Sequence, residues 1–135
     1  MILVDTSVWS LLLRRKSGPV HPLATDLARL IQDDIGLYLC GIIFQEILQG
    51  ISDRARARQI KTYLEDFELL DTQRDVHAQA ASIYSTCRTH GIAAHTVDCL
   101  IAATAIQHDC LLMTDDQDFT RIASISPLRL YVLKN

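Results

Sequence analysis

Short apolar runs alternate along this chain with longer segments in which apolar residues recur at helical spacing. The runs are apolar on both sides, which is typical of strands buried in a parallel sheet. Amphipathic helices between buried strands predict a three-layer α/β/α fold around a mostly parallel sheet of four or five strands. The expected strands are residues 2–4, 37–40, 67–70, 111–113 and 129–133, and the clearest expected helices cover 23–31, 76–87 and 97–105.

Three residues mark expected helix ends. Gly50 and Gly91 each follow a helical segment and fit C-terminal caps, whereas Thr96 precedes a helical segment and fits an N-terminal cap. No repeat, low-complexity tract or linker interrupts the pattern of strands and helices. We therefore expect a single domain spanning residues 1–135, a length suited to one hydrophobic core.

The apolar stretches and the cysteines indicate a cytoplasmic protein that does not bind membranes. The longest apolar stretches fall short of the ~20 residues that span a bilayer, and a charge at Asp5 argues against a signal peptide. The four cysteines form no CxxC pair, so we expect buried free thiols in a reducing compartment. The net charge of −3 argues against a protein that coats nucleic acid, although a local basic patch is compatible with it.

Acidic residues follow two of the expected strands. Asp5 follows the first strand, and Asp115, Asp116 and Asp118 follow the fourth. Because ligands collect beyond the carboxyl ends of parallel strands, these acids are expected to face one common site. Each also has a purely structural explanation: Asp5 fits a helix N-cap, and the other acids fit ordinary turn chemistry.

Two further acids lie in apolar helical segments. Glu46 is the one charge in residues 42–50, and Asp98 begins a helix that is small and apolar nearly all round. A solvated face would explain Glu46, and the favourable helix dipole would explain Asp98. Burial of either carboxylate would nevertheless require a partner for its charge.

Together these acids predict a cation. None of the acidic motifs contains a lysine or an arginine, so converging carboxylates would repel one another in the absence of a positive ion. All-oxygen ligation suits Mg²⁺ or Mn²⁺, and Mg²⁺ commonly completes its shell with substrate phosphate. The sequence therefore favours phosphodiester chemistry, in which the ion helps to activate a water molecule and neutralises charge on the phosphate.

The order and context of these acids strongly resemble the PIN-domain family over the whole chain. The motifs that carry the resemblance are VDTS at 4–7, EILQG at 46–50, VDCLIAA at 97–103 and TDDQDF at 114–119. The chain length is similar to that of the VapC-type toxins of toxin–antitoxin pairs, which are endoribonucleases. The resemblance therefore implies a metal-dependent endoribonuclease that cleaves RNA, forms a homodimer and is inhibited by a cognate antitoxin.

The resemblance also implies residue roles. It makes the acidic residues catalytic, namely Asp5, Glu46, Asp98 and Asp116. Three of these would bind the metal, namely Asp5, Asp98 and Asp116. Nearby hydroxyls and acids would support them, namely Thr6, Thr114, Asp115 and Asp118. The sequence leaves open which of the acids at 115, 116 and 118 completes the metal shell, and whether one or two ions bind.

Basic residues suggest a second surface. Arg54, Arg58 and Lys61 share one face of an expected helix, and Arg14, Arg15 and Lys16 form another cluster. Either group would contact RNA phosphates or a partner, and an ordinary solvated surface is an equal alternative.

Three alternative functions fit parts of the pattern. A housekeeping PIN nuclease and a catalytically silent PIN scaffold share the fold. A phospho-acceptor signalling module would use Asp5, Thr114 and Lys134, but it wants a second acid where Thr6 stands, and it leaves Glu46 and Asp98 without a role.

Overall fold

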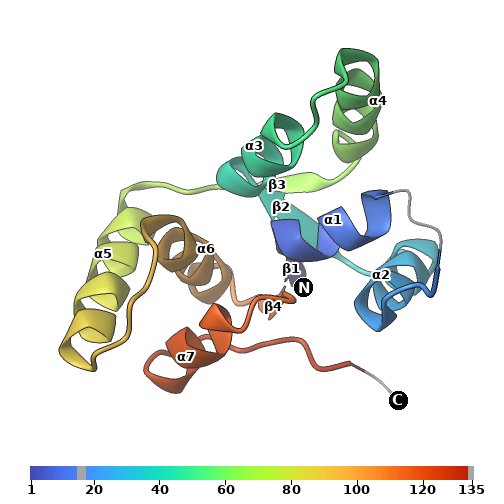
Figure 1. Ribbon diagram of the computed structural model, residues 1–135. Coiled ribbons are helices and arrows are strands. Elements are labelled where there is room, and N and C mark those ends of the chain that lie inside the picture. The colour runs from blue at the N-terminus through green and yellow to red at the C-terminus, as the bar shows by residue number, and fades with distance from the viewer. Residues whose placement is uncertain (15–17, 134–135) are drawn as a thin grey trace.

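The computed structural model describes residues 1–14 and 18–133, and it has the expected α/β/α architecture (Figure 1). The basic residues Arg15, Lys16 and Lys134 lie outside the described residues. Within the described residues the sheet has four strands in the order β3-β2-β1-β4, and all three neighbouring pairs are parallel. The strands are β1 (Ile2–Val4), β2 (Leu37–Cys40), β3 (Glu68–Leu70) and β4 (Leu111–Met113).

The expected fifth strand at 129–133 is reduced to an isolated parallel bridge between Leu130 and Leu112. Backbone hydrogen bonds join this segment to Leu112 on both sides of the bridge, from Leu112 N–H to the Arg129 carbonyl and from Tyr131 N–H to the Leu112 carbonyl. The Tyr131 side chain then donates to Asp26 on a neighbouring helix at 2.8 Å. The Tyr131–Asp26 hydrogen bond thus lies next to the point where this segment stops pairing with β4.

Helices cover both faces of the sheet. In Figure 1, α1 and α2 lie on one side, and α5, α6 and α7 lie on the other. The helices are α1 (Thr6–Leu13), α2 (Pro22–Gln32), α3 (Gly41–Gln49), α4 (Arg54–Leu64), α5 (Arg74–Thr89), α6 (Thr96–Gln107) and α7 (Asp118–Ser124). Among the described residues, no helix combines the length and apolar character needed to cross a membrane.

The packing of α6 explains its composition. Ala102, Ala103 and Ala105 are fully buried, so small side chains let this helix lie close against its neighbours. The buried hydroxyl of Thr104 is satisfied because it donates to the Leu100 carbonyl at 2.7 Å. A helix buried nearly all round is therefore confirmed.

Helix ends differ in detail from the sequence expectation. His95 occupies the N-cap of α6, so the prediction of Thr96 at that position is wrong by one residue, and Thr96 is already helical. Gly91 has φ +72°, the left-handed conformation that glycine adopts without a Cβ penalty after a helix end. Gly50 occupies the C-cap of α3 with φ −80°, a right-handed conformation open to other residues.

The strand register brings distant loops together. Val4 pairs with Met113, so the residues that follow β1 and β4 leave the sheet side by side. The backbone N–H of Asp5 donates to the Met113 carbonyl at 2.9 Å and extends this pairing by one residue. Helix α3 begins directly after β2, which places it at the same edge of the sheet.

Candidate active site

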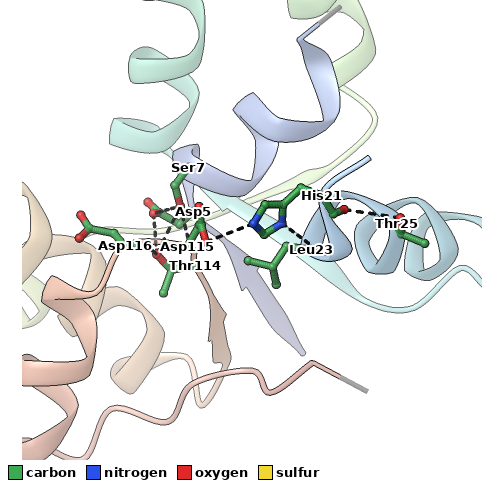
Figure 2. Close-up of polar contacts among 8 residues, drawn as sticks. All are labelled: Asp5, Ser7, His21, Leu23, Thr25, Thr114, Asp115 and Asp116. Carbon is green, nitrogen blue, oxygen red and sulfur yellow. Dashed lines mark hydrogen bonds and ion pairs between the residues drawn. The ribbon is translucent and has the colours of Figure 1, made fainter. Parts of the chain in front are cut away.

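Asp5 is a buried carboxylate at the end of β1, with only 5% of its surface exposed. Its Oδ2 atom accepts hydrogen bonds from the Ser7 hydroxyl at 2.7 Å and the Thr114 hydroxyl at 2.9 Å (Figure 2). Asp5 occupies the N-cap position of α1, but its side chain makes no capping hydrogen bond. The hydroxyls therefore orient the carboxylate through its Oδ2 atom.

The loop after β4 is held against this carboxylate. The Asp115 N–H donates to the Ser7 hydroxyl at 3.0 Å, and the Asp116 N–H donates to the Thr114 hydroxyl at 3.0 Å. The Asp118 N–H then donates to Asp116 Oδ1 at 2.9 Å, which begins α7. Each turn hydrogen bond thus also positions an acid, so turn chemistry and site geometry are compatible in this loop.

Asp98, Asp116 and Asp118 form a tight cluster. Each offers a carboxylate oxygen, and these oxygens lie within 4.8 Å of one another. A hard divalent cation accepts several oxygen ligands of this kind. The donor set therefore fits Mg²⁺ or Mn²⁺, and it includes Asp118, which the family resemblance gave only a supporting role.

Glu46 joins the site from α3. Its Oε1 atom accepts a hydrogen bond from the Thr6 hydroxyl at 2.9 Å. Between β2 and α3, the pKa of the Cys40 thiol is raised to about 11, mainly by burial and in smaller part by the charges of Asp5 and Glu46. Both carboxylates therefore act on the same point at the end of β2.

The electrostatics of the site disfavour the charged form of its central acids. Burial raises the pKa of Asp98 to about 6, and the charges of Asp116, Asp5 and Asp118 contribute in the same direction. Burial also raises the pKa of Asp5, although the Ser7 and Thr114 hydrogen bonds offset part of that rise. The repulsion inferred from the sequence is thus present between the carboxylates.

Two basic residues from outside the motifs lie beside these acids. Arg121, on α7, pairs with Asp118 at 2.6 Å. His21 accepts the Leu23 N–H at the start of α2, and its Nε2 atom lies 3.6 Å from Asp115 (Figure 2). The i, i+3 spacing of Asp118 and Arg121 was a usable signal for the first pair, whereas no sequence signal links His21 to Asp115.

Ser7 is the polar contact that the sequence reasoning did not select. It lies two residues after Asp5 and bridges that carboxylate to the Asp115 backbone. Its position beside an acid was visible, but its second partner is 108 residues away along the chain.

The expected site residues divide into two groups. The structure brings together the acids and hydroxyls from the ends of β1 and β4 and from α3 and α6, namely Asp5, Thr6, Glu46, Asp98, Thr114, Asp115, Asp116 and Asp118. Arg54, Arg58 and Lys61 lie exposed on α4, and Lys61 pairs with Glu65 at 3.0 Å. The basic stripe is therefore a separate surface feature.

Comparisons with known proteins agree with this architecture. The family model of the PIN domain matches residues 2–125. A VapC ribonuclease from Mycobacterium bovis is 32% identical over 132 residues, which cover 96% of each protein. The crystal structure of FitAcB from Neisseria gonorrhoeae aligns with a TM-score of 0.78 and 28% identity, covering 98% of this chain and 97% of that one.

A toxin–antitoxin complex from Klebsiella pneumoniae shares the fold, with a TM-score of 0.68 and 18% identity over 96% of this chain and 100% of that one. The family model spans almost the full length of the chain, and the alignment with the mycobacterial relative covers nearly all of both proteins. This chain belongs to the PIN-domain family and, within it, to the VapC ribonucleases.

Proposed function

We propose that this protein is a metal-dependent endoribonuclease that cleaves RNA phosphodiester bonds and acts as the toxin of a toxin–antitoxin pair. The observation that carries the proposal is the cluster of Asp98, Asp116 and Asp118 oxygens beside the buried Asp5. The ribonuclease name of the mycobacterial relative supports the reaction. The intact set of carboxylates, together with the raised pKa values of Asp5 and Asp98, argues against a catalytically silent scaffold.

The proposed metal ligands are Asp5, Asp98 and Asp116, with Asp118 added by its place in the cluster. Mg²⁺ or Mn²⁺ bound there would neutralise charge on the scissile phosphate and acidify a water molecule. Ser7 and Thr114 fix the Asp5 carboxylate through Oδ2 and so orient it as a ligand. Thr6 holds Glu46 through Oε1, so we assign Oε2 the role of orienting the attacking water.

We propose RNA, a cognate antitoxin and a second copy of this chain as partners. The antitoxin rests on the VapC relationship and on the similarity of the fold to that of the Klebsiella toxin–antitoxin complex. We expect the protein to act in the cytoplasm, where RNA is found and thiols stay reduced, because all four cysteines are free and buried.

The test is cleavage of a structured RNA by purified protein with Mg²⁺ or Mn²⁺ and with EDTA. EDTA should abolish cleavage, and Asp98→Asn should lower the rate at least about a hundredfold while the protein stays folded. Asp75→Asn is the matched control, because Asp75 also lies in the first turn of a helix but is exposed on α5. Full activity of Asp98→Asn would refute the proposed function.

A further inference from the structure

A cavity of about 430 Å³ lies beside the carboxylates, between the ends of α1 and α3 and the start of α4. This volume falls in the range of roughly 300–1,000 Å³ that is usual for sites that hold a small ligand or one unit of a larger one. Its lining includes Arg14, Glu46, Ile47, Ser52, Asp53 and Arg56.

Arg56 is held in place at the cavity. Its Nη2 atom donates to the Leu13 carbonyl at the end of α1, and its side chain is half-buried. The Asp53 carboxylate accepts the N–H groups of Ala55 and Arg56, at 2.9 and 3.4 Å, and so fixes the first turn of α4. The guanidinium is therefore oriented before any ligand binds, which lowers the entropic cost of binding.

The arginines at the cavity retain binding capacity. Within the part of the chain that the structure describes, neither Arg14 nor Arg56 forms an ion pair with a carboxylate, whereas Arg29, Arg121 and Arg129 each do. A guanidinium carries five N–H donors in a planar fork that matches phosphate oxygens. The two guanidinium groups are therefore the phosphate-binding groups of a cavity whose lining also contains the carboxylates of Glu46 and Asp53.

Glu46 connects this cavity to the carboxylates. It lines the cavity and also accepts the Thr6 hydroxyl, one residue after Asp5. A strand of RNA with its scissile phosphate at the acids carries its next phosphate one nucleotide away. That neighbouring nucleotide is the ligand whose chemistry and position fit the cavity, because the strand bound at the acids brings its next phosphate to the cavity without a second binding event.

We propose that this cavity is a nucleotide subsite, in which Arg56 and Arg14 bind the RNA phosphate next to the one that is cleaved. This inference rests on the proposed ribonuclease function and adds residues to it. The residues lie on α4 and at the end of α1, outside the acidic motifs.

The test measures binding of a short fluorescein-labelled single-stranded RNA to Arg56→Gln and Arg14→Gln in an Asp98→Asn background, where the RNA stays intact. Each variant should raise Kd about tenfold and reduce the slope of log affinity against log salt by about 0.7. The Kd of Arg56→Lys should lie between those of Arg56→Gln and the Asp98→Asn background, because lysine keeps the positive charge and loses the planar set of N–H donors. Arg74→Gln, an exposed arginine on α5, is the matched control and should bind as the background does.

Cleavage by the same substitutions in the active protein gives a second readout. Arg56→Gln should raise KM about tenfold and leave kcat within about twofold, because the lost contact binds the substrate without contacting the reacting atoms. Melting curves check that each variant is folded. If Arg56→Gln unfolds, Arg14→Gln remains usable as the test variant, since the Arg14 side chain makes no hydrogen bond among the described residues.

Three results would overturn the subsite. Unchanged affinity and salt slope in both arginine variants, with RNA cleavage intact in the wild type, would remove the subsite and leave the ribonuclease function standing. Normal RNA binding with lost affinity for an acidic antitoxin peptide would reassign the cavity to a protein partner. Absence of any RNA cleavage by the wild type would remove the proposed function and the subsite together.

Discussion

Asp98 lies in the first turn of α6, where the helix dipole favours a negative charge, yet its pKa is raised to about 6. Burial and the neighbouring acids therefore outweigh the dipole. The sequence allowed a purely structural explanation for Asp98, in which the start of the helix stabilises its charge. That explanation would lower its pKa, whereas the structure raises it.

This balance predicts how stability without metal depends on pH. The folded-state pKa of Asp98 lies above its unfolded value of 3.8, so the folded state binds the proton more tightly and stability rises as pH falls through about 6. Between pH 7 and pH 4.5 in EDTA, wild type should gain about 1–2 kcal/mol relative to Asp98→Asn, allowing for solvent screening of a half-buried group. Urea unfolding of both proteins measures this difference.

Comparison with Asp98→Asn cancels the titration of carboxylates remote from Asp98, whereas the coupling of Asp98 to the charges of Asp116, Asp5 and Asp118 stays part of the measured difference. Equal pH dependence of the two proteins would contradict the raised pKa of Asp98. A gain in the stability of wild type relative to Asp98→Asn as pH rises would contradict the sign of the pKa shift.

At the residue level, the sequence identified the acids but only some of the groups that hold them. Asp5, Asp98 and Asp116 stand out because a charge interrupts or follows an apolar run. Ser7 does not stand out, because its importance depends on a contact with the Asp115 backbone, 108 residues away along the chain. Hydrogen-bond partners far apart in sequence become visible only once the strand register is known.

Among the helices and strands, buried elements were predicted well and boundary elements less well. Helix α6 and strands β1 and β4 consist mostly of apolar residues. Such segments must be buried in the core, so few other placements in the fold are open to them. The segment at 129–133 is equally apolar by pattern, but Tyr131 bonds to Asp26, and the chain makes only a single bridge to the sheet. Local propensity cannot anticipate a tertiary contact of that kind.

Helix α4 carries two sets of basic residues with different expected roles. Arg54 and Arg58 are exposed, and Lys61 is paired with Glu65, whereas Arg56 lines the cavity. We predict that Arg54→Ala/Arg58→Ala/Lys61→Ala weakens RNA binding no more than about threefold and flattens its salt dependence slightly. Arg56→Gln alone should have the larger effect. Salt titrations of RNA binding by both proteins test this order.

Arg74→Ala/Arg88→Ala, which removes two exposed arginines from α5, is the control for the loss of overall positive charge. A salt slope identical to that of wild type in the α4 triple variant would assign the stripe to ordinary solvated surface. A larger effect than that of Arg56→Gln would instead shift the main RNA contact to the stripe.

For the whole molecule, the parallel sheet is the reason that acids distant in sequence meet. Parallel strands end at one edge, so Asp5 after β1 and the acids after β4 converge without any local signal between them. The alternation of strands and helices made this convergence predictable. The distances within the acidic cluster, and the inclusion of Asp118 in it, were not predictable, because they depend on the turn between β4 and α7.

Convergence also means that the protein without metal carries unfavourable energy at its site. Asp5 is buried, and its pKa is raised by that burial. Asp5→Asn removes a buried like charge and keeps an oxygen that accepts the Ser7 and Thr114 hydroxyls, so in EDTA it should melt at the same temperature as wild type or higher. Adding Mn²⁺ should raise the melting temperature of wild type more than that of Asp5→Asn, because an ion that binds only the folded state stabilises that state. The difference between the two melting temperatures should therefore shrink or change sign.

Four melting curves, of wild type and Asp5→Asn with and without Mn²⁺, measure this coupling. At an ion concentration a hundredfold above Kd, wild type should gain about 2.7 kcal/mol, or about 10 °C in Tm, and Asp5→Asn should gain much less. Asp26→Asn is the matched control, because Asp26 is also buried but pairs with Tyr131 and Arg29 away from the acids, and it should respond to Mn²⁺ as wild type does. Strong destabilisation of Asp5→Asn in EDTA together with a full response to Mn²⁺ would make Asp5 a structural residue and confine the metal to Asp98, Asp116 and Asp118.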